Sequence, residues 1–138
     1  MEDFPVDQLS ATAARIWTWG DDISMEIDLA PIDMFRDGEF SDRLIRLDSV
    51  KLPTTDLAVL SGRTFDFPLN PEDGYIDGSV YFLDRHNPVD VTKIVFSALE
   101  RDGAIVTIEA AFLLEFEGTG YRNFRKVLSC RIRQEAPW

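Results

Sequence analysis

The fold of this 138-residue chain is decided by residues 104–117, which read AIVTIEAAFLLEFE. Every second residue of the stretch is apolar: Ala104, Val106, Ile108, Ala110, Phe112, Leu114 and Phe116. Successive side chains of an extended strand point to opposite faces, so these residues form one apolar stripe against a core. The other face mixes glutamates with Ile105 and Leu113 and is only partly solvated. The stretch predicts a β-sheet protein with a long central strand.

The segments around this strand extend the sheet. Residues 79–83, 91–99, 104–117 and 121–133 are joined by short turn-forming segments at 84–88, 100–103 and 118–120. Short connections favour antiparallel neighbours, so residues 79–133 are predicted to form a four-stranded meander. A hairpin is predicted to join residues 15–19 and 23–29 through Gly20, Asp21 and Asp22, and residues 43–52 supply a further strand.

The remaining segments are short. Residues 4–14 fit either a short helix or an extended lead into the next strand, and residues 53–62 fit one or two helical turns with a threonine cap. Residues 64–67 fit a short strand, and residues 68–78 a surface loop. The prediction is a single, mostly β domain over residues 1–138. It is an antiparallel β-sandwich or incomplete barrel built on the C-terminal meander, with one or two short helices.

Composition restricts the partners. Asp and Glu number 25 against 14 Lys and Arg, giving a formal charge of −11, most of it carried by residues 1–60. A field of this sign repels nucleic acid and anionic membranes and attracts basic proteins. The chain has one cysteine, no signal-peptide pattern at its first residues and no segment of about 20 apolar residues. These features predict a cytoplasmic protein.

Residues suited to catalysis or metal binding are few. His86, the one histidine, lies in a polar turn away from any nucleophile motif, and Cys130 shares a strand face with Leu128 and Ile132, as a small buried hydrophobe does. The acids of residues 72–77 lack the ligand spacing of a calcium loop. The prediction is therefore a non-catalytic protein with no cofactor and no metal. An unfamiliar enzyme using Asp84 and His86 ranks last among the alternatives.

The acidic N-terminal part is the predicted binding surface for a basic partner protein. One class that fits is the bacterial immunity or inhibitor protein that neutralises a basic toxin such as a nuclease. Eight residues are candidates for this contact: Asp21, Asp22, Glu26, Asp28, Asp33, Asp37, Glu39 and Asp42.

Two other binding functions stay open. Trp17 and Trp19 share one face of a predicted strand and would line an aromatic cavity if the protein were a β-barrel or sandwich that binds a small molecule. Alternatively, an open edge strand would let the chain form a homo-oligomer.

The last predicted strand is basic and contains no acid between Tyr121 and Arg133. It superficially resembles a nucleic-acid-binding stripe, but the charge of −11 opposes that function. We expect its cations to form salt bridges with Glu109, Glu115 and Glu117 of the preceding strand. The cations concerned are Arg122, Arg125, Lys126, Arg131 and Arg133.

Overall fold

The computed structural model describes residues 1–35, 39–40 and 42–137. The described elements are η1 (Val6–Gln8), β1 (Ala11–Trp19), β2 (Asp22–Leu29), β3 (Leu44–Asp48), α1 (Leu57–Leu60), β4 (Thr64–Asp66), β5 (Asp77–Phe82), β6 (Arg85–Phe96), β7 (Ala104–Phe112) and β8 (Phe124–Gln134). The mostly β fold predicted from the sequence is confirmed. None of the described helices is long and apolar enough to cross a lipid bilayer.

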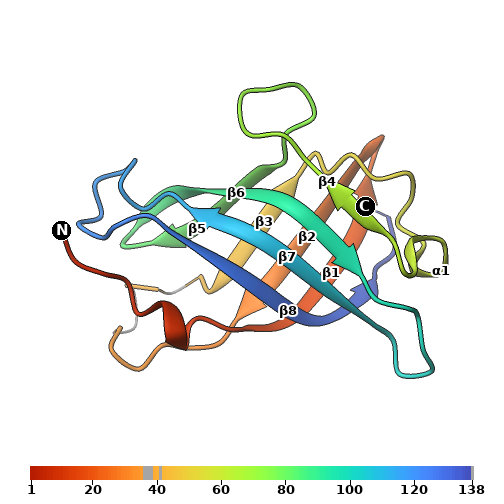
Figure 1. The fold of residues 1–138 in the computed structure, drawn as a ribbon, viewed down its shortest axis with the longest axis horizontal. Coiled ribbons are helices and arrows are strands. Elements are labelled where there is room, and N and C mark those ends of the chain that lie inside the picture. Colours follow the sequence, from red (N-terminus) through yellow and green to blue (C-terminus); the bar gives the residue numbers. More distant parts are fainter. Residues whose placement is uncertain (36–38, 41, 138) are drawn as a thin grey trace.

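Among the described residues, seven strands close into a barrel. Neighbours pair in the order β1, β2, β3, β5, β6, β7, β8, and all of these pairs are antiparallel. The ring closes because β8 returns to β1 as a parallel neighbour at Ala14–Ile132, Arg15–Arg133 and Ile16–Gln134. Figure 1 shows β6, β7 and β8 as one wall, with β1, β2 and β3 crossing behind it. The predicted four-stranded meander is confirmed, whereas the sandwich or incomplete barrel is corrected to a closed barrel.

The long strand β6 is shared by three neighbours. One edge pairs with β7 over most of its length, while the other pairs first with β5 and then, near its end, with β4. The predicted turn at residues 84–88 is wrong, because β6 already begins at Arg85. The turn consists of Leu83 and Asp84, both at positive φ, as a two-residue hairpin requires. The amide of the buried Asn87 stabilises it by donating to the carbonyl oxygens of Val80, Phe82 and Arg85.

The strand β7 ends earlier than its apolar alternation suggests. Pairing with β8 stops at Phe112, and residues 113–117 lie in the β7–β8 connection. Side chains there satisfy backbone groups that a longer ladder would have used. The Thr119 hydroxyl donates to the Leu114 carbonyl at 2.8 Å, and the Glu115 amide donates to Asn123 Oδ1 at 2.9 Å.

The barrel interior is filled by alternate residues of every wall strand. On β7, Ala104, Val106, Ile108, Ala110 and Phe112 are buried, so the stripe predicted from the sequence faces the core up to the end of the strand. Burying one large apolar side chain of this kind contributes roughly 1.5–3 kcal/mol. Aliphatic and aromatic side chains therefore fill the interior of the barrel.

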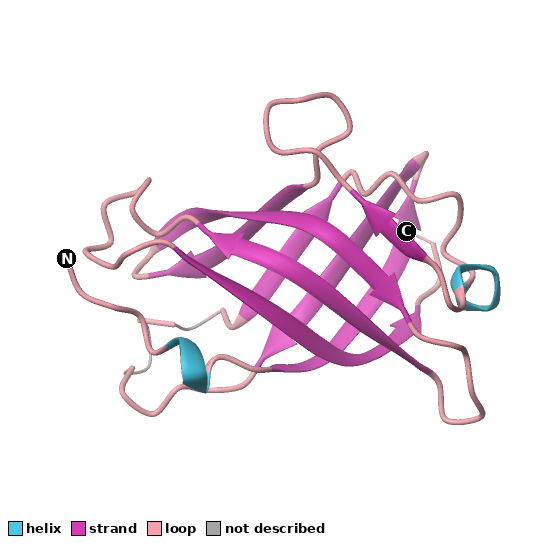
Figure 2. Ribbon diagram, viewed as in Figure 1, coloured by secondary structure: helices cyan, strands magenta, loops and turns pink. Residues whose placement is uncertain are grey.

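Both ends of the barrel are closed. At the end where β2 finishes and β8 begins, seven rings form an aromatic plug: Phe4, Phe35, Phe40, Phe82, Phe112, Tyr121 and Phe124. The hollow left beside these rings is about 10 Å³, hardly enough for one water molecule. At the opposite end, α1 buries Leu60, and the Asp56 carboxylate accepts from the Ala58 amide at 2.9 Å, so the helix cap is Asp56 rather than a threonine. Figure 2 places the two short helices near opposite ends.

Candidate functional site

Carboxylates gather at the end of the barrel that the aromatic plug closes. We call this surface the acidic end. It is formed by the N-terminal segment, the β2–β3 connection, the β5–β6 turn and the β7–β8 connection. Figure 1 shows the N-terminus together with the β5–β6 turn and the β7–β8 connection at the left of the molecule. The described acids of the acidic end are Glu2, Asp3, Asp7, Asp33, Glu39, Asp42, Asp84, Glu115 and Glu117.

Backbone hydrogen bonds hold these segments together. The Glu2 amide donates to the Gly120 carbonyl at 2.8 Å, and the Arg122 amide donates to the Glu2 carbonyl at the same distance. The Leu83 amide donates to the Glu39 carbonyl at 2.7 Å, which joins the β5–β6 turn to the β2–β3 connection. Acids far apart in the sequence are therefore fixed on one surface, and the negative field comes from several segments at once.

The pKa of the Tyr121 side chain is affected by the nearby carboxylates. Burial in the aromatic plug raises the pKa of its phenol, and the carboxylates of Glu2 and Glu39 raise that pKa further, since they disfavour a second negative charge. The carboxylates of Glu2 and Glu39 therefore act on the Tyr121 phenol in the same direction as its burial.

An exposed aromatic residue stands among these acids. Phe116 is 76% exposed and lies between the exposed Glu115 and Glu117, while Met34 of the β2–β3 connection is 56% exposed. The connection that presents Phe116 is held at its base, because Glu115 and Asn123 exchange two hydrogen bonds of 2.9 Å each. Aromatic side chains are enriched among the residues that dominate protein interfaces, so Phe116 is a candidate contact residue. The exposure of Phe116 could not be predicted from the sequence, because this residue continues the apolar alternation of the preceding strand.

The acids predicted to bind a partner lie on different parts of the molecule. Asp33, Glu39 and Asp42 lie at the acidic end, but the turn that carries Asp21 and Asp22 lies at the opposite end of the barrel. Asp37 lies outside the described residues. The other two predicted residues, Glu26 and Asp28, are on the outer face of β2. The seven described candidates therefore do not form one continuous surface.

Glu26 and Asp28 already have cationic neighbours. The Arg15 guanidinium on β1 contacts a Glu26 oxygen at 3.0 Å and an Asp28 oxygen at 2.8 Å. On β3, Arg46 Nε lies 3.9 Å from Glu26 Oε2, and Arg46 Nη1 lies 2.8 Å from Asp42 Oδ2. The hydrogen bond to Asp28 is the largest cause of the raised Arg15 pKa. These cross-strand ion pairs reduce the negative charge that Glu26 and Asp28 can offer to a partner.

Trp17 and Trp19, the residues predicted to line an aromatic cavity, lie outside the barrel interior. Ala14 and Ile16 of β1 point into the barrel, so Trp17 and Trp19 belong to its outer face, and Trp19 is 65% exposed. The indole N–H of Trp17 is buried and has no hydrogen-bond partner within the described part of the chain. The two tryptophans occupy the outer surface next to the β1–β2 turn rather than the core.

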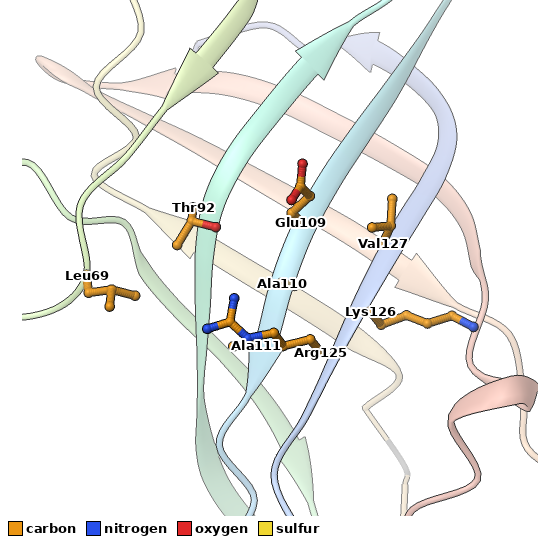
Figure 3. Close-up of a pocket in the computed structure, with 8 residues that line it drawn as sticks. All are labelled: Leu69, Thr92, Glu109, Ala110, Ala111, Arg125, Lys126 and Val127. Atoms are coloured by element: carbon orange, nitrogen blue, oxygen red, sulfur yellow. The ribbon is translucent and has the colours of Figure 1, made fainter.

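A shallow hollow of about 150 Å³ lies on the outer face of β6, β7 and β8, beside Leu69. Figure 3 shows the Arg125 side chain extending from β8 across Ala111 of β7, while Lys126 points away from the hollow. The register explains the lack of the predicted salt bridges: Arg125 is opposite Ala111, and Glu109 is opposite Val127. Instead, Glu109 Oε2 lies 3.8 Å from Lys93 Nζ on β6.

The other cations of β8 and of the segment before it pair elsewhere. Arg122 contacts Asp3 and Arg131 contacts Asp102, both at 2.8 Å, while Arg133 contacts Glu135 at 2.9 Å. The predicted bridges to Glu109, Glu115 and Glu117 are therefore replaced by pairs with carboxylates outside β7.

Within the described residues, the histidine and the cysteine lie in different parts of the barrel. His86 is exposed at the start of β6, and its ring lies 5.3 Å from that of Tyr81. Across the described ranges, no group of three or more His, Cys, Asp or Glu is placed to hold a metal ion. Cys130 is buried on the inner face of β8, as its sequence pattern predicts.

The burial of Cys130 predicts that its thiol reacts slowly in the folded protein. Burial, with a smaller effect of Asp28, raises the pKa of its thiol to about 11. Since the thiolate is the reactive form, the folded protein at pH 8 should react with an aromatic disulfide reagent roughly 100-fold more slowly than urea-unfolded protein. Because the folded pKa exceeds the unfolded one, this group stabilises the fold at pH values below about 9, and that stability is lost as the pH rises towards 11.

A matched control for this measurement uses the neighbouring position. In a Cys130→Ala background, Ser129→Cys places a thiol on the exposed face of the same strand and should react quickly in the folded state. Equal rates for folded wild-type protein and the Ser129→Cys variant would contradict the buried position of Cys130.

The site is thus a negatively charged barrel end, closed by aromatic rings and carrying an exposed phenylalanine. Comparisons of this chain with protein-family models, curated proteins and solved structures give no match.

Proposed function

We propose that the protein is a non-catalytic binding module whose acidic end receives a basic partner protein. The observation that carries this proposal is the exposed Phe116, held on a hydrogen-bonded loop within a surface of carboxylates. Interfaces commonly gain most of their binding energy from a few aromatic residues surrounded by polar contacts. Carboxylates around such an anchor steer a cationic partner and exclude an anionic one.

An immunity or inhibitor protein that neutralises a basic toxin, such as a nuclease, is the specific class we propose. Nucleases need a cationic surface to hold phosphates, and an acidic surface can occupy it. A standard interface buries about 800 Å² on each partner, roughly a tenth of the 7684 Å² of accessible surface of this chain. The cytoplasmic location inferred from the sequence remains a prediction.

The alternative of a barrel that binds a small molecule in its interior has less support. Ligand cavities usually measure about 300–1,000 Å³. The hollow beside the aromatic plug measures about 10 Å³. A ligand could enter there only if core rings moved apart, so the outer surface is the better candidate for binding.

The partner can be identified by cross-linking from the proposed anchor. A photoreactive phenylalanine analogue is placed at position 116 and, in a control protein, at Val59, which is 52% exposed on α1 at the opposite end. After irradiation in a lysate of the source cells, we expect one basic protein attached to position 116 and not to position 59. No product, or the same products from both positions, would contradict the proposal.

With the purified partner, Phe116→Ala should weaken binding about 30-fold or more, because truncating a buried interface anchor costs about 2 kcal/mol or more. Val59→Ala should leave the dissociation constant unchanged. Added salt should weaken the complex, since the carboxylates contribute through screened charge. Calorimetry at two salt concentrations measures both effects, and an affinity independent of Phe116 would remove the anchor from the proposal.

A further inference from the structure

The hollow on the outer face of β6, β7 and β8 has an apolar lining. Its volume is about 150 Å³, and an apolar cavity of about this size can hold one benzene molecule. Leu69 and Val127, which line it, are 50% and 58% exposed, and the small Ala111 side chain leaves the space between strands unfilled. An aromatic ring placed here would cover apolar surface that is in contact with water.

Arg125 adds a positive charge to this lining. Its side chain extends from β8 across Ala111 (Figure 3), and no ion pair joins it to an acid within the described residues. Asp90 of β6 is opposite the same alanine without pairing to Arg125. Glu109 also lines the hollow, but Lys93 lies 3.8 Å from it and offsets its charge. Because a guanidinium attracts both carboxylates and aromatic faces, the hollow suits a ring with a carboxylate beside it.

The β7–β8 connection of the same chain presents these two groups next to each other. Phe116 is 76% exposed, and Glu117, which follows it, is also exposed. The Glu115 carboxylate accepts a hydrogen bond from the Asn123 amide at 2.9 Å, whereas Glu117 has no ion pair in the part of the chain that the structure describes. The chain therefore carries both a hollow and a loop of complementary size and charge.

The loop and the hollow are neighbours on the surface. Pairing of β7 with β8 ends at Phe112 and Phe124, one residue pair beyond Ala111 and Arg125, and the connection begins there. Phe116 does not line the hollow of its own chain. A two-fold axis between the two features would place the loop of each copy on the hollow of the other, so that both contacts form at once.

We propose that two copies of this chain form such a dimer, with Phe116 of each copy in the hollow of the other copy. Glu117 then pairs with Arg125 across the interface. Each contact is small, so we expect a dissociation constant in the micromolar range or weaker. The dimer goes beyond the proposed function, because it forms without a basic partner. Such a partner would displace the second copy from Phe116.

The net charge of the chain does not prevent this association. Two chains of −11 repel each other, but salt at about 0.1 M screens this repulsion over about 10 Å. The contacts between Glu117 and Arg125 act at shorter range and carry opposite charges. Nucleic acid is a poor alternative occupant, since its phosphates would meet the negative field of the whole chain.

Sedimentation equilibrium of the full chain tests the dimer. We expect the average mass to rise with concentration from that of one chain to that of two and no further. Phe116→Ala should weaken the association at least tenfold, whereas Val59→Ala should leave it unchanged. A monomer up to about 1 mM protein, growth beyond two chains, or an unchanged dimer in Phe116→Ala would overturn the proposal.

Exchange of the two charges tests the contact itself. Arg125→Glu and Glu117→Arg each bring like charges together in a dimer of one variant, so each alone should associate at least tenfold more weakly. In an equimolar mixture of the two variants, every contact joins one acid and one cation, so the dimer should return. Arg101→Glu, on the β6–β7 turn, makes the same change of net charge as Arg125→Glu and should leave the dimer intact.

The mixture separates contact from net charge. If the two variants stayed monomeric together, or if Arg101→Glu weakened the dimer as much as Arg125→Glu, the pairing of Glu117 with Arg125 would be wrong. None of these measurements uses a basic partner. Failure of the dimer would therefore leave the proposed function standing, and failure of the proposed function would leave the dimer standing.

Discussion

Replacing Phe82 with alanine is expected to lower the free energy of unfolding by about 3–5 kcal/mol, the usual cost of truncating a fully buried phenylalanine. Phe82 is 2% exposed at the end of β5. Its ring lies 4.9 Å from that of Phe35, 5.5 Å from Phe4 and 5.4 Å from Tyr121. Truncation leaves a cavity between the N-terminal segment, the β2–β3 connection and the β7–β8 connection.

Urea denaturation followed by tryptophan fluorescence measures this loss. The control is Phe116→Ala, which removes an exposed ring of the same size and should change stability by less than about 0.5 kcal/mol. The two substitutions should thus differ: Phe82→Ala should lower stability, whereas Phe116→Ala should lower only the proposed binding of a partner. A comparable loss of stability in both variants would show that the Phe116 ring packs against the protein.

Replacing Gly78 with alanine is expected to destabilise the protein by about 3 kcal/mol or more, through a clash with the backbone. A Cβ atom at this position would lie 2.2 Å from the Val89 carbonyl oxygen and 3.1 Å from Leu47 Cδ2. Gly78 pairs with Leu47 of β3, and β6 passes beside it, so neither neighbour can move without opening the barrel wall. The close approach of β5 and β6 depends on the missing side chain.

The matched control for Gly78→Ala is Gly62→Ala. Gly62 has φ of +72° and nothing within 4 Å of an added Cβ, so alanine there costs only the strain of a left-handed backbone, about 1 kcal/mol. Thermal unfolding of both variants separates steric clash from backbone strain. If Gly62→Ala were the more damaging substitution, the close contact with Val89 would not control this part of the wall.

Local patterns were sufficient where one strand contacts the next along the chain. The alternation of residues 104–112 and the turns on either side predicted the antiparallel meander, since neighbouring strands with short connections have few other ways to pair. The same patterns failed at strand ends. Phe116 continues the alternation, but the ladder ends at Phe112; beyond it, Thr119 donates to the Leu114 carbonyl and Asn123 Oδ1 accepts from the Glu115 amide. The turn before β6 was likewise predicted too late in the chain: it consists of Leu83 and Asp84, and the Asn87 side chain stabilises it by donating to the Phe82 carbonyl.

The candidate site depended on contacts between distant segments. The excess of acids pointed to a basic partner, but charge counts could not show that Glu2, Glu39 and Glu117 share one end of the barrel while Asp21 and Asp22 lie at the other. The register of β8 against β7 likewise placed Arg125 opposite Ala111 rather than opposite the glutamate with which a salt bridge was expected.

The sequence by itself determined the β class, the meander and the apolar stripe, because these follow from the period of two and from short turns. Only the tertiary structure decided that the sheet closes, that β8 returns to β1 in parallel, and that the N-terminal segment pairs beside the start of β8. The physical reason is that closure joins strands more than a hundred residues apart, and no local pattern encodes which of their edges meet.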